Sequence, residues 1–357
     1  MVDFSPLTLL PDNRWLRIAL LAGSTVYLVA LTQVMVVTWL HFRNARHKRR
    51  VAALKHRFAP IFVACLEGTD LPVPPCKPRD LLSVLIIWLF YIESTRGESR
   101  ERLRRLGCAM ELPSRCLNLL AQGNLSARLV AISALGRLRE PAAWDALQRW
   151  IDDDDPTLSL TALRAAIQID ASRGLASLME RLSARTDWPE ARLNTMLREA
   201  PKEDVEQALL EGLTRGNPKT LPQVVRWLEI AQPADVWGRL LGLLEQHASI
   251  DVVASVLHVA RDPRLLPAIR SLAEHPYWVV RTKVASALGR LGDKSDIERL
   301  GRLLCDPVWW VRYRAACALI ALPFFDRKAL ETWGNRLDDQ FAKDMLSQTL
   351  AEHVGRN

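Results

Sequence analysis

The sequence has few of the residues on which catalytic and metal-binding sites usually depend. Its 357 residues include only six cysteines, seven histidines and sixteen glycines. No two cysteines form a CxxC pair, which argues against a disulfide scaffold and against a structural zinc site. The sequence contains no HxH, HExxH, GxSxG, GxGxxG or Walker phosphate-loop motif. We therefore expect no catalytic residue, no metal site and no cofactor, and we predict that the protein is not an enzyme.

Acidic residues are absent from one short segment, and this segment holds most of the net charge. The formal net charge is +8. Seven cations lie between residues 43 and 57 with no acid among them, and we name them the basic collar: Arg43, Arg46, Lys48, Arg49, Arg50, Lys55 and Arg57. The rest of the chain is therefore almost neutral, so we expect no nucleic-acid partner.

Residues 18–42, directly before the collar, carry no charged side chain. As a helix, these 25 residues would be about 37 Å long, enough to cross a hydrocarbon core of about 30 Å. Trp15 and Trp39 stand where interfacial aromatic residues are expected. A buried core helix is rarely so long without charge, and a signal peptide has a shorter apolar run and a cleavage site. We predict a transmembrane helix over residues 15–42.

The collar predicts the orientation of this helix. Because Lys and Arg remain on the cytoplasmic side, the tail of residues 1–14 should lie outside a bacterial inner membrane and the rest inside. The collar (residues 43–57) either only fixes this topology, which we favour, or also contacts anionic lipid headgroups. Its seven residues are therefore candidate membrane-surface contacts. Residues 58–121 are predicted to form a helical connector and N-terminal cap, including a short buried or interfacial helix over 81–92.

The most informative pattern is an internal repeat of about 31 residues. Residues 275–305 align without a gap on residues 306–334, and weaker copies begin near residues 155, 187, 217 and 249. Each copy has the apolar periodicity of two helices separated by a turn. Such a helix pair cannot bury its apolar face alone, so successive pairs must stack. We predict an all-α fold, with a right-handed α-solenoid over residues 122–335 and a capping helix over 336–357.

The phrase DPxxxVRxxAAxALxxL, preceded by IxxLxxLLxD, resembles the HEAT repeat, specifically the short type of phycobilisome-lyase-like proteins. The resemblance is strong over residues 275–322 and clear over 124–170, whereas 187–262 lack the Arg of the VR pair. It implies stacked antiparallel helix pairs with a concave protein-binding surface. It also implies that Asp306, Arg281 and Arg312 form a ladder between turns and helices of successive repeats, which is a structural role.

Three tryptophans fall in equivalent turns just before the second helix of successive units: Trp278, Trp309 and Trp310. One interpretation, slightly favoured by us, is that they fill apolar gaps between repeats. The other is that they form an exposed aromatic strip, because Trp and Arg are frequent anchors of protein interfaces. These three residues are our candidate partner-binding residues.

Together these features predict a non-catalytic, membrane-anchored scaffold that binds a protein partner at the cytoplasmic face of the membrane. Confinement to the membrane would raise its effective concentration for membrane-bound partners, such as the enzyme of a complex in which it is an accessory subunit. One alternative is a phycobilin-lyase-like enzyme or chaperone acting on a bound cofactor. Another is a nucleic-acid-binding solenoid. No residue pattern indicates a small-molecule substrate.

Overall fold

The computed structural model describes residues 14–69, 71–246, 249–324 and 327–354, with the backbone alone for residues 14–17, 47, 327, 353 and 354. Every regular element among these residues is helical, which confirms the predicted all-α class. The chain divides into two compact units, Met1–Leu138 (unit 1) and Arg139–Asn357 (unit 2). The repeat array was predicted to begin at residue 122, but the helix over Leu125–Leu138 belongs to unit 1.

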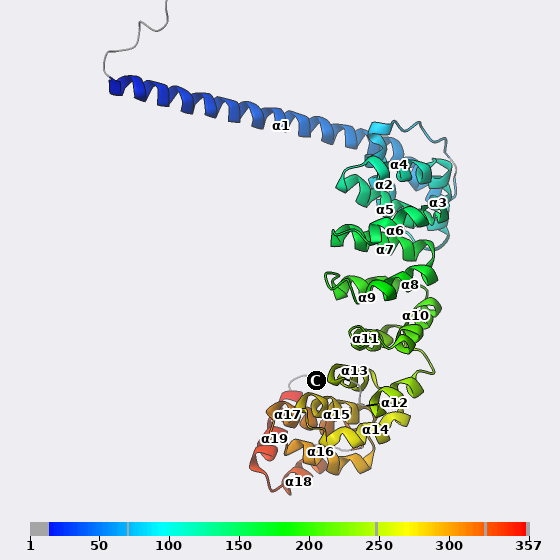
Figure 1. The fold of residues 1–357 in the computed structure, drawn as a ribbon, viewed down its shortest axis with the longest axis vertical. Helices are drawn as coiled ribbons and strands as arrows, with labels where there is room; N and C mark the ends of the chain where they lie inside the picture. The colour runs from blue at the N-terminus through cyan, green and yellow to red at the C-terminus, as the bar shows by residue number, and fades with distance from the viewer. Residues whose placement is uncertain (1–13, 70, 247–248, 325–326, 355–357) are drawn as a thin grey trace, which may run out of the picture. The chain divides into compact units, whose positions relative to one another are not determined.

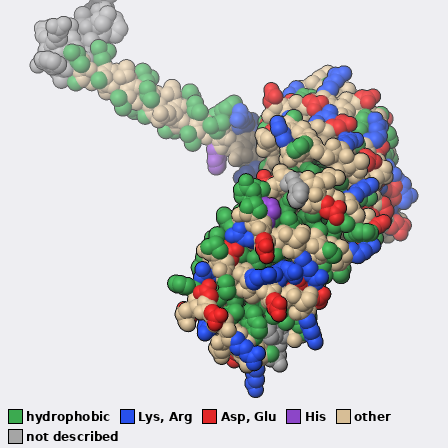
Figure 2. All heavy atoms as spheres, turned by 60° about the horizontal axis from the view of Figure 1, so that its bottom comes forward, with side chains coloured by type: hydrophobic (Ala, Val, Ile, Leu, Met, Phe, Trp, Pro, Cys, Tyr) green, Lys and Arg blue, Asp and Glu red, His purple; other side chains and the backbone are tan. Residues whose placement is uncertain are grey.

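Unit 1 is organised around one long helix, α1 (Arg14–Glu67), which contains 54 residues. The sequence predicted a span, a basic segment and a separate connector, whereas all three begin within this one helix (Figure 1). From Ile18 onward α1 is long and apolar enough to cross a membrane by length and composition, and its most apolar stretch is fully exposed. In Figure 2 the blue Lys and Arg side chains gather toward the C-terminal end of this rod. The side chain of Trp15 lies outside the described residues.

The C-terminal part of α1 packs into the remaining helices of unit 1, namely α2 (Leu81–Ser94), α3 (Gly97–Ala109), α4 (Leu112–Gln122) and α5 (Leu125–Leu138). Phe58 and Phe62 of α1 are completely buried. Helix α2 is the predicted short apolar helix, and its Trp88 is buried with the indole Nε1 donating to the Leu103 carbonyl at 3.1 Å. Burial of these apolar side chains therefore holds the part of α1 that follows the collar against the other helices of unit 1.

Unit 2 is a stack of helix pairs (Figure 1). In one layer, neighbouring helices α11, α13, α15 and α17 pack side by side in chain order, and in the other α8 packs on α10 and α12 on α14. This arrangement agrees with the predicted α-solenoid. The helices are α6 (Trp144–Ile151), α7 (Pro156–Ile169), α8 (Ala171–Arg181), α9 (Glu190–Glu199), α10 (Lys202–Arg215), α11 (Leu221–Ala231), α12 (Trp237–Glu245), α13 (Ile250–Val259), α14 (Leu266–Ser271), α15 (Trp278–Leu291), α16 (Ile297–Leu304), α17 (Trp309–Ala321), α18 (Arg327–Gly334) and α19 (Gln340–Val354).

Capping side chains lie at the starts of α7 and α13, which coincide with predicted repeat boundaries. The Asp155 carboxylate accepts from the backbone N–H of Thr157 at 2.8 Å, and the Ser249 hydroxyl accepts from that of Val252 at 3.4 Å. These bonds satisfy N–H groups that have no partner within the helix. The turn residues that define the repeat in the sequence therefore also set where α7 and α13 begin.

Small residues allow α15 and α17 to approach closely. A Cβ atom added to Gly289 of α15 would lie 2.8 Å from both the Cα and the Cβ of Ala318 on α17. Ala285 and Ala315, on the facing surfaces, are completely buried. Contacts this close leave no room for an added methyl group, so they fix how far apart these two helices lie.

We expect Gly289→Ala to lower the free energy of unfolding by about 1–3 kcal/mol, because overpacking outweighs the higher helix propensity of alanine. Gly242→Ala is the matched control, since the nearest atom to its added Cβ is the end of a Gln side chain at 4.0 Å. The control should be neutral or stabilising by up to about 1 kcal/mol. Urea unfolding measures both, and equal effects of the two substitutions would contradict the close approach.

Candidate interaction surface

The predicted ladder residues come together between α15 and α17. Arg281 donates from Nε to Asp306 Oδ2 at 2.6 Å and from Nη2 to Oδ1 at 2.9 Å. Its Nη1 reaches the His275 carbonyl at 2.8 Å, and Arg312 Nε donates to the backbone carbonyl of Asp306. The Asp306 side chain is only 7% exposed, so this bidentate pair lies largely out of water. Arg281 thus joins its own helix to the turn that starts the next repeat.

A second arginine–carboxylate cluster lies on the adjacent turn and was missed in the sequence. Asp296 is completely buried and accepts from Arg270 Nε at 2.9 Å and from Arg299 Nη1 at 2.7 Å. It also accepts from the backbone N–H of Asp293 at 3.0 Å, which completes a capping box. Burial acts to raise the pKa of Asp296, but the hydrogen bonds from Arg270 and Asp293 lower it overall. The Asp-x-x-Asp spacing was the available signal, because it matches a capping box.

The candidate tryptophans are exposed. Trp278 and Trp309 are the first residues of α15 and α17, not residues of the turns before them. Trp278 is 43% exposed, Trp309 48% and Trp310 54%. Trp309 stacks on Tyr313 with ring centroids 5.3 Å apart and meets Trp310 edge-on at 4.8 Å. About half of each indole is exposed to solvent, so these tryptophans present apolar surface that a partner could cover.

Two cations accompany these indoles. Lys283 on α15 and Arg314 on α17 are 31 residues apart, the same offset that relates Trp278 to Trp309. Within the described residues, neither cation is ion-paired with a carboxylate. The lowered pKa of Lys283 has burial as its main cause, with the nearby charges of Arg314 and Arg290 adding to it. We name the surface formed by these helices the aromatic–cationic face: Trp278, Val279, Lys283, Trp309, Trp310 and Arg314.

The collar residues lie along α1. Arg50 donates from Nε to Asp80 Oδ1 at 2.6 Å and thereby joins α1 to the start of α2, so this member of the collar also has a structural role. Arg43 lies over the Trp39 ring at 4.6 Å. The other members of the collar are exposed to solvent: Arg46, Lys48, Arg49, Lys55 and Arg57.

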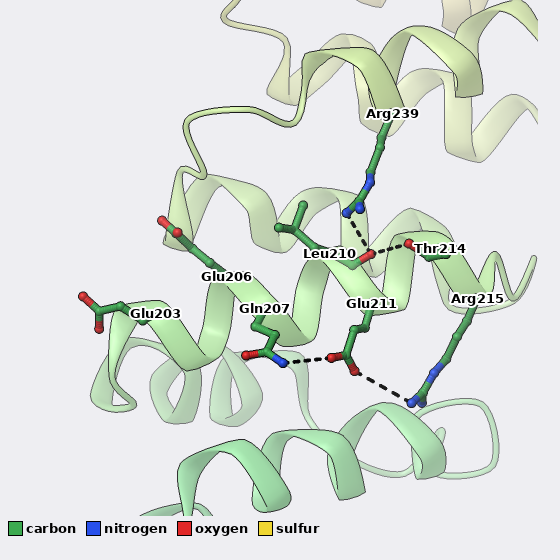
Figure 3. Close-up of a pocket in the computed structure, with 8 residues that line it drawn as sticks. All are labelled: Glu203, Glu206, Gln207, Leu210, Glu211, Thr214, Arg215 and Arg239. Atoms are coloured by element: carbon green, nitrogen blue, oxygen red, sulfur yellow. Dashed lines mark hydrogen bonds and ion pairs between the residues drawn. The ribbon is translucent and has the colours of Figure 1, made fainter.

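An open pocket of about 580 Å³ lies over α10 and α12 (Figure 3). Glu211 accepts from Gln207 Nε2 at 3.1 Å and lies 3.9 Å from Arg215, while Arg239 donates to the Leu210 carbonyl at 3.1 Å. Figure 3 shows the carboxylates of Glu203 and Glu206 pointing away from this row. The polar groups therefore mostly pair with one another and do not converge on a common point.

A second cavity, of about 720 Å³, lies among α9, α11, α12 and the turn before α14. Four of its charged groups are paired: Arg261 Nη2 lies 3.1 Å from Glu229 Oε1, and Arg264 Nη2 lies 2.6 Å from Asp262 Oδ2. Across the described residues, no three His, Cys, Asp or Glu side chains are grouped as a metal site. The aromatic–cationic face is therefore the strongest candidate site.

The family model for HEAT repeats matches residues 239–320. This segment contains the Arg281–Asp306 pair and the whole aromatic–cationic face. The match supports the interpretation of this chain as a HEAT-repeat protein. A search of curated proteins finds none that matches the chain.

We expect Arg281→Ala to lower the free energy of unfolding by about 3–5 kcal/mol, because Asp306 would remain buried without its cation. Arg226→Ala is the control, since Arg226 lies 3.5 Å from Glu190 in an ion pair with both side chains at least 41% exposed. That exposed pair should contribute no more than about 1 kcal/mol. Similar losses for the two variants in urea unfolding would argue against a structural role for the ladder.

Proposed function

We propose that this protein is a membrane-anchored, non-catalytic scaffold that binds another protein through the aromatic–cationic face. The observation that carries this proposal is the exposure of Trp278, Trp309 and Trp310 on tightly packed helices. Large exposed apolar groups that cluster in this way are typical of interaction sites, and Trp is prominent among the residues that dominate binding energy. The HEAT-repeat match supports a scaffold role.

Membrane anchoring is the second part of the proposal. A core helix of a soluble protein would be buried, whereas the apolar stretch of α1 is exposed throughout. A signal sequence can have the same composition, but here the helix that carries the apolar stretch continues without a break through the collar into the part of α1 that packs through Phe58 and Phe62. This continuity supports a retained anchor.

The proposed orientation places the collar and both folded units on the cytoplasmic side of a bacterial inner membrane. From Arg43 to Arg50 the helix rises about 10 Å, which matches the depth of a headgroup region next to the span. Confinement at this surface raises the effective concentration for partners in the same membrane. A membrane enzyme with this protein as its accessory subunit fits such a role. The right-handed superhelix and the short phycobilisome-lyase-like repeat type remain predictions, supported by the repeat of about 31 residues.

Anchoring and orientation can be tested with the native cysteines. We expect the full chain to sediment with membranes and to resist alkaline carbonate extraction. The exposed thiols of Cys108 and Cys305 should react with a membrane-impermeant maleimide only after the cytoplasmic side is opened. A Cys108→Ser/Cys305→Ser variant gives the background labelling. Release by carbonate would overturn the anchor, and labelling in intact spheroplasts would overturn the orientation.

The partner surface can be tested by photocrosslinking in native membranes from a benzoylphenylalanine placed at Val279. We expect Trp309→Ala/Trp310→Ala to reduce capture of the partner by about tenfold or more, because interface tryptophans often contribute 2 kcal/mol or more. Phe90→Ala is the matched control, since Phe90 is a 63% exposed aromatic on α2. The thermal midpoint should stay unchanged in both variants. Undiminished capture, or unfolding of the double variant, would contradict this assignment.

A further inference from the structure

We infer that the partner's docking segment is an amphipathic α-helix that carries two acidic residues seven positions apart. This inference rests on the proposed function and specifies the chemistry of the partner at the same surface. It derives from the way the aromatic–cationic face repeats from α15 to α17.

Three pairs of surface residues are related by the 31-residue offset: Trp278 and Trp309, Val279 and Trp310, and Lys283 and Arg314. Lys283 is half-buried and the other five are exposed. Helices α15 and α17 pack side by side. Equivalent residues on neighbouring repeats therefore lie at the same level along their helices. Packed helices have axes about 8–10 Å apart, so this face offers two copies of one recognition pattern at that spacing.

An α-helix crossing α15 and α17 matches this spacing. Seven residues of a helix rise about 10.5 Å and return to within about 20° of the same direction. An extended strand covers the same distance in about three residues, but residues three apart point to opposite faces of a strand. A helix can therefore present one side chain to Lys283 and an equivalent one to Arg314, whereas a strand cannot.

The charges on and around the face favour acidic side chains at these two positions. Glu229 lies near Lys283, but it is paired with Arg261 at 3.1 Å and lies 3.7 Å from His258. Glu352 of α19 lies 3.5 Å from the Tyr313 hydroxyl and does not form an ion pair with Arg314. Lys283 and Arg314 therefore retain charge that a carboxylate could neutralise. A neutral or basic helix would cover these cations without compensation, which costs binding energy.

The apolar residues of the face determine which side chains the partner helix must carry beside its two acidic residues. Trp278, Val279, Trp309 and Trp310 are each at least 36% exposed, so they can accept a stripe of leucine or similar side chains. Lys283 is half-buried and is therefore less accessible than the three indoles, which are at least 43% exposed. A side chain projecting from a helix can reach it, whereas the flat surface of a lipid bilayer would meet the indoles first. The geometry favours a protein helix over a membrane.

The test uses the full chain in nanodiscs of neutral lipid and a stapled helical peptide of about 18 residues. The peptide carries a leucine stripe and two glutamates seven positions apart, and fluorescence anisotropy measures its binding. We expect Lys283→Glu/Arg314→Glu to weaken binding by roughly 10-fold to 100-fold, because two attractions become repulsions. Replacing both peptide glutamates with lysine should restore binding to this variant. The charge-matched control Lys219→Glu/Lys328→Glu, at two exposed lysines, should bind like the native chain.

Peptide spacing is the sharper test. Moving one glutamate so that the two are five positions apart should weaken binding to the native chain by roughly tenfold, because the second carboxylate then points away from Arg314. Equal binding of both peptides, no binding of either, or equal losses in the two double variants would overturn the inference. Quenching of the exposed indoles by brominated anionic vesicles with no peptide binding would also overturn it, in favour of a membrane contact.

The photocrosslinking experiment separates failure of this inference from failure of the proposed function. If the captured segment is a helix with acids seven apart, both are supported. If a partner is captured through the indoles by a segment without such acids, the proposed function is retained and the inference fails. If capture does not depend on the indoles, the proposed function itself fails.

Discussion

The close packing of α15 against α17 is the constraint on which the candidate site depends. Gly289 and Ala318 allow the helices to touch near their C-terminal ends, and the buried Arg281–Asp306 pair joins them at the turn before α17. Contacts at two separate levels prevent one helix from sliding along the other. Because the register is fixed, equivalent residues of the two repeats align, and a sequence repeat becomes a repeated surface.

Residues two positions apart on these helices have different roles. Arg281 and Lys283 point in directions about 160° apart around α15, since each residue advances about 100°. Arg281 therefore reaches the turn of the next repeat, where Asp306 lies, whereas Lys283, four residues after Val279, lies on the same side of α15 as Val279. The same division holds on α17, where Arg312 contacts the Asp306 carbonyl and Arg314 remains on the surface. One set of cations stabilises the array and the other is available for a partner.

The sequence was sufficient to predict the all-α class and several helix starts, because capping residues such as Asp155 and Ser249 act locally. It also placed Asp306 beside Arg281, through the resemblance to HEAT repeats. It did not indicate that α5 packs within unit 1, since an apolar face does not reveal which neighbour buries it. The Asp296 cluster escaped notice because Arg270 is 26 residues away in the chain. The exposure of Trp310 could not be predicted, because the position of a residue within a repeat does not determine how far its side chain is buried.

The central claim is that Val279 and Trp310 lie at the same level on neighbouring helices. Spin labels at Val279→Cys and Trp310→Cys test it most directly, in a background without the accessible thiols of Cys76, Cys108, Cys305 and Cys317. Labels about 10 Å apart should broaden the continuous-wave EPR spectrum strongly, whereas labels at Val279→Cys and Arg192→Cys, three helix pairs apart, should not. A spectrum of the first pair identical to the sum of its single-label spectra would contradict the account.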